Sequence, residues 1–380
     1  MEKRIFNNIG KEISLLGFGG MRFPLLEGTG EIDYAKAEAL IARAMQAGIN
    51  YYDTAWGYHG GESETFFGNA MKKYPRESYY LASKMPTWEA LVNAKEDVER
   101  IFETQLLKCQ TEYFDFYLAH ALSKEHREVF EAFDIYDFLM EKKKEGKIKH
   151  LGFSFHDNPE VLQGIVDDYA WDFAQIQLNY VDWEASNAKQ QYEILAERNI
   201  PVLIMEPVRG GALAALNEEA TIFLKAQDEA ASIASWGMRF AGSLPGVMCV
   251  LSGMTTMEQL GDNIKTFSNF KSLSEAEYAA IEQAKTAYLA AGTIPCTGCR
   301  YCMPCPVGVD IPRVFALYNN YLSNKEKNIQ WFKNSYRALM DAEKAKNCIA
   351  CGVCVTLCPQ NIAIPEHMAE ITAFTEKLGV

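Results

Sequence analysis

Eight of the ten cysteines lie in two short motifs near the C-terminus. The second motif reads CxxCxxCxxxCP, the run that holds bacterial 4Fe-4S clusters and whose fourth thiolate serves the neighbouring cluster. The first motif is one residue shorter before its last cysteine. Two 4Fe-4S clusters with crossed ligands are therefore expected, one on Cys296, Cys299, Cys302 and Cys358 and the other on Cys348, Cys351, Cys354 and Cys305. A structural zinc site, which also uses paired CxxC units, is the alternative.

Titratable side chains end three consecutive apolar runs in the first half of the chain. Asp53 ends INYYD, Lys84 ends SYYLASK and His120 ends FDFYLAH. Tyr58 follows Asp53 by five residues. Each residue alone is explained as a strand-terminal group with local hydrogen bonds, whereas four of them on three successive runs indicate one site.

These four residue types suit the interconversion of a carbonyl and an alcohol. Reduction of a carbonyl builds up negative charge on an oxygen that needs a proton, and Tyr58 is the candidate acid. A free tyrosine has a pKa of about 10, so a Lys84 cation held by Asp53 favours the phenolate and eases proton transfer near neutral pH. His120 is expected to orient and polarise the carbonyl oxygen. In alcohol oxidation Tyr58 acts as the base, so both directions stay open.

Short β-branched or aromatic runs alternate with longer amphipathic stretches up to about residue 290, and helices are expected over Asp33 to Ala47 and Glu89 to Leu107. The runs are Ile13 to Gly17, Ile49 to Asp53, Tyr79 to Lys84, Asp115 to His120, Ile148 to Ser154, Phe173 to Asn179, Pro201 to Glu206 and Val247 to Leu251. Eight such units predict an α/β fold, a (β/α)8 TIM barrel, which takes about 250 residues plus insertions. An open doubly wound sheet is the alternative.

The alternation stops near residue 290, where the density of cysteines rises. We therefore expect a barrel over residues 1–290 and a small ferredoxin-like iron-sulfur domain over residues 291–380. Between the cysteine motifs, IPRVFALYNNYL and IQWFKNSYRALMDAEKA show helical periodicity. This pattern favours a helical domain over a compact β-rich ferredoxin.

Composition excludes several classes of partner. With 48% hydrophobic and 23% charged residues the chain is typical of folded globular proteins. A net charge of −13 repels nucleic-acid phosphates and anionic membrane surfaces, so neither partner is expected. The sequence shows no secretory apolar region near its start and no apolar run near the ~18 residues that span a bilayer. A cytoplasmic protein is therefore expected.

The site residues resemble the aldo-keto reductase family, in the subgroup with a C-terminal 4Fe-4S ferredoxin-like domain, and the resemblance covers essentially the whole chain. The family's tetrad is matched by Asp53 and Tyr58 in DTAWGYHGGESE, Lys84 in LASKM and His120 in YFDFYLAHAL. The resemblance implies NADP(H) or NAD(H) as hydride carrier and a small carbonyl or alcohol as substrate. It implies neither metal nor flavin in the barrel.

No GxGxxG joins a strand to a helix, so a Rossmann domain is not indicated. The resemblance implies that the cofactor lies extended across the barrel mouth. Carboxamide contacts then fall at Ser154 and Gln175, and Met205 stands where the family has a stacking aromatic ring. The other implied contacts are Gly20, Met21, Arg22, Val208, Arg209, Gly210, Gly253, Met254, Thr255, Gln259 and Asn263. Because Gly253 and Gln259 replace cations that bind a 2′-phosphate in many members, Arg22 or Arg209 would have to read that group. For this segment, VLSGMTTMEQLGDN, an ordinary capped helix is the alternative.

The clusters raise a question of electron count. NAD(P)H gives two electrons as hydride, each 4Fe-4S cluster takes one, and no flavin site is evident to split the pair. We therefore expect the clusters to relay electrons between a redox partner protein and a substrate or radical bound in the barrel. Clusters that only stabilise their domain, beside an ordinary reductase barrel, are the alternative. For the whole chain, a further alternative is a nucleotide-binding, redox-sensing interaction module with structural clusters, which the complete tetrad disfavours.

Overall fold

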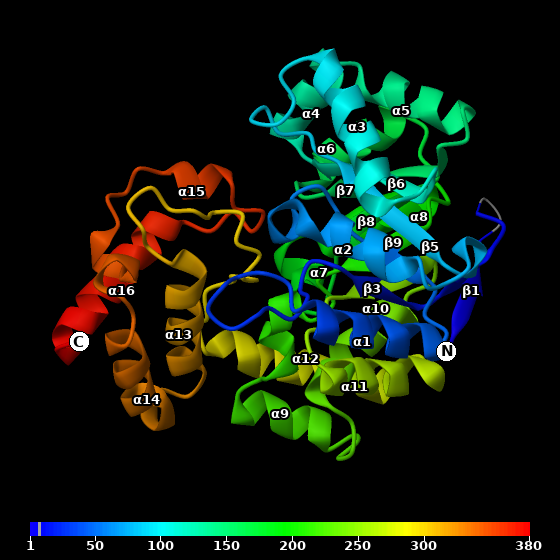
Figure 1. Ribbon diagram of the computed structural model, residues 1–380. Coiled ribbons are helices and arrows are strands. Elements are labelled where there is room, and N and C mark those ends of the chain that lie inside the picture. The colour runs from blue at the N-terminus through cyan, green and yellow to red at the C-terminus, as the bar shows by residue number, and fades with distance from the viewer. Residues whose placement is uncertain (7–8) are drawn as a thin grey trace. The chain divides into compact units, whose positions relative to one another are not determined.

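The computed structural model describes residues 1–6 and 9–380 (Figure 1). Contacts between residues divide the chain into two compact units. The first unit comprises Met1–Pro207 and Gly237–Leu273, and the second comprises Val208–Trp236 and Ser274–Val380. In the part of the chain described, no helix is long and apolar enough to cross a membrane.

The first unit is a closed barrel of parallel strands in the order β10-β3-β4-β5-β6-β7-β8-β9. The strands are β3 (Leu16–Gly19), β4 (Tyr51–Asp53), β5 (Tyr80–Met85), β6 (Phe114–Leu122), β7 (Ile148–Phe155), β8 (Phe173–Gln177), β9 (Val202–Met205) and β10 (Val247–Ser252). Asp53 pairs in register with Gly19 on one side and with Ala82 on the other. The predicted TIM barrel is thus confirmed, and its strand ends meet at one rim.

Large apolar side chains fill the interior of the barrel. Tyr51, Phe116, Phe173, Leu203 and Met248 belong to one buried cluster. The rings of Phe116 and Tyr51 are 5.1 Å apart, and those of Phe116 and Phe173 are 5.2 Å apart, both edge to face. Burial of rings of this size contributes roughly 1.5–3 kcal/mol each, so the interior is a packed core that holds the rim in place.

Helices of the first unit surround the strands (Figure 1). They are α1 (Tyr34–Gln46), α2 (Glu62–Met71), α3 (Lys95–Cys109), α4 (Lys124–Ala132), α5 (Ile135–Lys144), α6 (Pro159–Asp168), α7 (Asp182–Ala185), α8 (Ala188–Glu197) and α11 (Met257–Ser268), with 3-10 turns η1 (Tyr58–Gly61) and η2 (Arg76–Ser78). Helix α10 (Ile233–Ser243) begins in the second unit and ends in the first. Asp33, Asn158 and Thr256 cap their helices by accepting a backbone N–H with the side chain.

Two predicted boundaries in the first unit are wrong, and side-chain hydrogen bonds explain both. The run from Ile13 begins in β2 (Glu12–Ser14), which pairs antiparallel with β1 (Lys3–Ile5), and the barrel strand starts only at Leu16. Ser14 and Asn50 each accept the other's backbone N–H with a side-chain oxygen. The helix expected from Glu89 begins at Lys95. The Asp97 carboxylate accepts the N–H groups of Asn93 and Ala94, and these bonds fix the start of the helix.

The second unit is helical. It contains η3 (Arg209–Ala214), α9 (Glu218–Lys225), α12 (Glu275–Ala290), α13 (Ile311–Ser323), α14 (Lys325–Arg337), η4 (Asp341–Glu343), η5 (Ala345–Asn347), α15 (Val353–Thr356) and α16 (Ile364–Leu378). Phe315, Phe332, Tyr336 and Met368 form its buried core. The helix predicted to run on to Ala345 stops at Arg337, where the chain folds back so that the Ala345 N–H bonds the Tyr336 hydroxyl.

Candidate active site and iron-sulfur centre

Three neighbouring strands carry the titratable residues to one rim of the barrel. The Lys84 ammonium on β5 donates to Asp53 Oδ1 on β4 at 2.6 Å and to the Thr54 carbonyl at 2.8 Å. Its third contact is Tyr58 Oη at 3.3 Å. The side chain of Lys84 is fully buried. Asp53, Lys84 and Tyr58 therefore form one hydrogen-bonded chain.

Tyr58 begins the turn η1 between β4 and α2. The next three residues, His59, Gly60 and Gly61, all have positive φ, which two glycines adopt without strain. This tight turn directs Tyr58 back toward Lys84. The ring of His120, at the end of β6, stands edge-on to the Tyr58 ring with centroids 6.0 Å apart. The structure thus brings all four sequence-predicted catalytic residues together.

Burial controls the charges of this group. Burial lowers the pKa of Lys84, and the adjoining Asp53 carboxylate opposes that change. Burial also raises the pKa of Asp53, against the attraction of Lys84. The pKa of His120 falls well below its usual value, first through burial and then through the charges of Lys84, His156 and His126. His120 is therefore neutral near pH 7 and carries one ring N–H that can act as a donor.

A buried polar network behind Lys84 was missed by sequence reasoning. Glu64 on α2 accepts hydrogen bonds from Ser83 at 2.7 Å and from Gln105 at 2.6 Å. Gln105 also donates to the Lys84 carbonyl at 3.0 Å and accepts from the Tyr117 hydroxyl. One signal was available, since a 3.6-residue period places Glu64 on the apolar face of ESETFFGNAM.

Ser154 and Gln175 lie opposite each other on β7 and β8. The Ser154 hydroxyl accepts the Ala121 N–H at 2.7 Å, and the Gln175 amide lies 3.5 Å from the sulfur of Met205. Gln175 Oε1 is buried and has no hydrogen-bond partner among residues 1–6 and 9–380. A buried acceptor of this kind fits an amide group of a ligand, such as a carboxamide.

The segment after β10 is a capped helix start. Gln259 Oε1 accepts the N–H groups of Thr255 and Thr256 in a capping box, and Asn263 donates to the Ser252 hydroxyl at 3.0 Å. The predicted cofactor contacts Gln259 and Asn263 therefore make hydrogen bonds within this segment. Met254, a third predicted contact, is buried.

Arg22 is the cation beside this segment. A Cβ at Gly253 would lie 3.1 Å from the Arg22 side chain, and Thr255 donates to the Arg22 carbonyl at 2.9 Å. The guanidinium pairs with Glu206 at 3.8 Å. Gly20 lies in the same loop as Arg22, and its carbonyl accepts a hydrogen bond from the Ser63 hydroxyl. Met21 lies between Gly20 and Arg22 in the sequence.

Val208, Arg209 and Gly210 belong to the second unit. Arg209 is buried, and a Cβ at Gly210 would lie 2.0 Å from the Thr297 carbonyl oxygen. The backbone at Gly210 therefore lies close to the first cysteine motif, in which Thr297 follows Cys296.

The cysteine thiols gather in two groups within the second unit. The thiols whose charges act on Cys302 are those of Cys299, Cys296 and Cys358, and burial with these neighbours raises the pKa of Cys302 to about 12. The corresponding neighbours of Cys354 are Cys348, Cys351 and Cys305. Each group contains three thiols of one motif and the last thiol of the other, the arrangement expected for crossed ligation.

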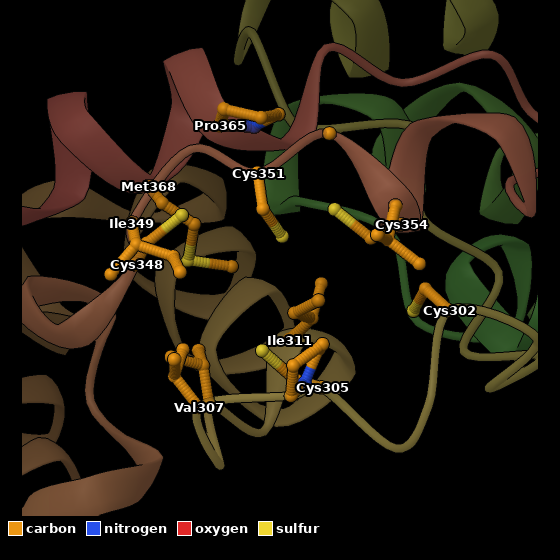
Figure 2. A pocket seen from close by; sticks show the side chains of 14 residues that line it. Cys302, Cys305, Val307, Ile311, Cys348, Ile349, Cys351, Cys354, Pro365 and Met368 are labelled. Carbon is orange, nitrogen blue, oxygen red and sulfur yellow. The ribbon is translucent and has the colours of Figure 1, made fainter.

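The four thiols of the Cys354 group, together with Cys302 of the other group, line one cavity of about 420 Å³, including its open mouth. Its other walls are mostly apolar, among them Val307, Ile311 and Met368. Figure 2 shows the sulfur atoms of Cys305 and Cys351 directed into the same hollow. An all-thiol donor set in an apolar pocket fits an iron-sulfur cluster.

Within the described residues, no three His, Cys, Asp or Glu side chains are grouped as they would be around a single metal ion. A 4Fe-4S cubane binds each thiolate through a different iron atom. The four thiolates of a cluster are therefore farther apart than the ligands of a single metal ion.

Comparison with known proteins gives matches to both parts of the chain. The model described as "Aldo/keto reductase family" matches residues 15–286, and that described as "4Fe-4S dicluster domain" matches residues 295–363. An uncharacterised oxidoreductase of Bacillus subtilis, YqkF, is 27% identical over 315 residues, covering 74% of this chain and 96% of that protein. L-galactose dehydrogenase of Arabidopsis thaliana is 23% identical over 291 residues, covering 72% and 90%. An aldo-keto reductase from Klebsiella pneumoniae, solved in complex with NADPH, has the same fold, with a TM-score of 0.58 at 20% identity over 76% of this chain and 96% of that one.

Proposed function

Because the chain belongs to the aldo/keto reductase family, we propose that it interconverts a small carbonyl compound and its alcohol with NADP(H) or NAD(H). It is an oxidoreductase that carries a 4Fe-4S domain. The observation that carries the proposal is the hydrogen-bonded chain from Asp53 through Lys84 to Tyr58 at the barrel rim.

In this mechanism the nicotinamide, when bound, supplies the hydride. Tyr58 donates its proton to the carbonyl oxygen as negative charge develops there. Lys84, 3.3 Å away, stabilises the phenolate that is left, and Asp53 keeps the buried lysine charged. His120 donates an N–H to the same carbonyl oxygen, and because it is neutral it does not repel the Lys84 ammonium.

Ser154 and Gln175 hold the carboxamide in this proposal, with the buried Gln175 Oε1 as acceptor for its NH2 group. Met205 packs on the ring through its thioether. Arg22 is the cation assigned to the phosphates. The other proposed contacts are Gly20, Met21, Val208, Arg209, Gly210, Gly253, Met254, Thr255, Gln259 and Asn263.

The second unit holds two 4Fe-4S clusters in this proposal, each on three cysteines of one motif and the last cysteine of the other. The clusters relay single electrons to or from a redox partner protein. Supporting this role, Cys351 is exposed, so the cluster it binds has an edge that a partner can approach.

The test is the substitution Tyr58→Phe in the full-length holoprotein. A substrate is first found by screening aldehydes, ketones, sugars and hydroxysteroids under anaerobic conditions. Loss of the proton donor should lower turnover by about 10²-fold or more and leave cofactor affinity nearly unchanged.

Titrations with NADH and with NADPH measure that affinity and also rank the two cofactors. A preference for NADPH above tenfold would assign the reading of its 2′-phosphate to Arg22 or Arg209.

Tyr136→Phe, which removes a hydroxyl that bonds the backbone of Ala170 before β8, is the matched control. Turnover that is the same in the Tyr58→Phe and Tyr136→Phe proteins would falsify the role of Tyr58.

A further inference from the structure

A second buried carboxylate lies behind Lys84. Glu64 is fully buried, and its Oε1 receives the hydrogen bonds of Ser83 and Gln105. Burial raises the pKa of this carboxyl group, whereas the hydrogen bonds from Ser83 and Gln105 and the charges of Lys108 and Lys84 favour its ionised form. Glu64 has no place in the proposed tetrad, so its burial calls for another explanation.

Lys108, at the end of α3, connects this carboxylate to the turn that carries Tyr58. Its ammonium lies 3.8 Å from Glu64 Oε2 and donates to the Gly61 carbonyl at 3.1 Å. It also lies 4.4 Å from the centre of the Trp56 ring. Trp56 precedes Tyr58 and Gly61 ends its turn, so one ammonium group contacts both sides of the turn.

Glycines allow this approach. A Cβ at Gly61 would lie 3.1 Å from the Lys108 ammonium, and φ there is +92°. A Cβ at Gly68 would lie 2.2 Å from the Lys108 carbonyl oxygen, so α2 and α3 meet too closely for a side chain. The position of Lys108 is therefore set by the packing of two helices, which distinguishes it from a mobile surface ion pair.

We propose that Glu64 and Lys108 are a positioning pair for the reductase site, in which Lys108 holds the Tyr58 turn and the two opposite charges together set the pH range over which Tyr58 keeps its proton. This inference rests on the proposed function of Tyr58. Glu64 acts from behind Lys84, whereas Lys108 acts from beside the turn.

Other titratable groups face the same residues. Asp53 and His120 face Lys84, and Tyr117 and Cys109 face Glu64. All four stay unchanged in the variants described next. A difference between those variants therefore reports the charges of Glu64 and Lys108.

The two charges have opposite expected effects. A negative charge near Tyr58 disfavours the phenolate, so Glu64→Gln should make Tyr58 lose its proton at lower pH. A positive charge favours the phenolate, so Lys108→Met should make it lose the proton at higher pH. Gln keeps the shape and the acceptor oxygen of Glu64, and Met keeps the apolar stem that packs on Trp56.

The experiment titrates tyrosinate absorbance of the full-length holoprotein. Each variant is measured against the same variant with Tyr58→Phe, so that the difference isolates Tyr58. We expect a shift of roughly 0.5–1 pH unit downward for Glu64→Gln and a similar shift upward for Lys108→Met. The double variant should return close to the wild-type midpoint, and Lys108→Arg should keep it.

Shifts in the same direction, or no shift in either single variant, would overturn the positioning pair. If Glu64→Gln fails to fold, the contrast between Lys108→Met and Lys108→Arg decides alone. This outcome is separable from the proposed function. Turnover that persists in Tyr58→Phe overturns the role of Tyr58 in the reaction, whereas unmoved midpoints with Tyr58-dependent turnover overturn only the pair.

Discussion

Among single side chains, two histidines at the site are held neutral by burial. Burial lowers the pKa of His120 well below 6.5 and that of His156 to about 4. The unfolded chain takes up these protons below about pH 6.5, and the folded chain does not. More protons on the unfolded state mean that stability rises with pH over this range. The barrel should therefore lose stability as the pH falls from about 6.5 toward 4.

His156→Gln should remove part of that pH dependence. Between pH 7 and pH 5 a histidine shifted from 6.5 to about 4 accounts for about 2 kcal/mol of lost stability. Urea unfolding at both pH values, followed by tryptophan fluorescence, measures the loss. The variant should lose about 2 kcal/mol less than the wild type over this interval. An equal loss in both proteins would show that His156 takes up its proton in the folded state.

The sequence allowed part of the site to be predicted. Asp53, Lys84 and His120 end consecutive runs, and consecutive strands of a parallel barrel are neighbours, so their meeting follows from the fold class. For Glu64 the one signal was its place on the apolar face of α2, but an acidic residue in the first turn of a helix equally suits a surface position at the helix dipole. Its inward position depends on hydrogen bonds from two other elements, Ser83 on β5 and Gln105 on α3, which no local pattern shows.

Among helices and strands, the contact between α2 and α3 is the most tightly specified near the site. Gly68→Ala would place a methyl group 2.2 Å from a backbone oxygen that no rotamer change can move. We expect the free energy of unfolding to fall by roughly 1–3 kcal/mol, as for overpacked cores. Because α2 carries Glu64 and follows the Tyr58 turn, turnover should fall as well. Denaturant unfolding and steady-state rates measure the two effects.

Gly261→Ala on α11 is the matched control. No atom lies within 4 Å of the Cβ it would add, so alanine should stabilise that helix by up to about 1 kcal/mol. If Gly68→Ala raised the free energy of unfolding as Gly261→Ala does, the close packing of α2 on α3 would not exclude a side chain at Gly68.

The strands were easier to predict than their ends. Eight apolar runs were enough to indicate a barrel, because the period and number of the runs are properties of the whole fold. The starts of β3 and α3 depend on single pairs of hydrogen bonds, Ser14 with Asn50 and Asp97 with the N–H groups before it. Hydrogen bonds of single side chains do not change the periodicity of apolar residues, so the sequence pattern does not show where these elements start.

For the chain as a whole, crossed ligation makes a test of the proposed clusters possible. Cys305 lies in the first motif but faces Cys354 of the second. Replacing Cys305 with Ala should therefore disturb the same cluster as Cys348→Ala, and a different one from Cys296→Ala. Iron content and electron paramagnetic resonance of the three variants measure this. If Cys305→Ala instead matched Cys296→Ala, each motif would bind its own cluster.

The relay proposal can be tested through its electron count. Two reduced clusters hold two electrons, which together with two protons are enough to convert one carbonyl to its alcohol. We expect protein reduced anaerobically with dithionite, and then given a carbonyl substrate without nicotinamide, to reoxidise its clusters. Visible absorbance and electron paramagnetic resonance follow the reoxidation, and product should form at about one per two electrons. A protein without substrate is the control for slow reoxidation.

A structural role makes the opposite prediction. Clusters that only stabilise the second unit should keep their electrons in the presence of substrate, cofactor or a co-purifying redox protein, and their removal should lower only the melting temperature. The exposure of Cys351 favours exchange, because a cluster edge in contact with solvent lies within reach of a docked carrier. Two clusters that never exchange electrons under any of these conditions would overturn the relay and leave the barrel as a reductase with a structural iron-sulfur domain.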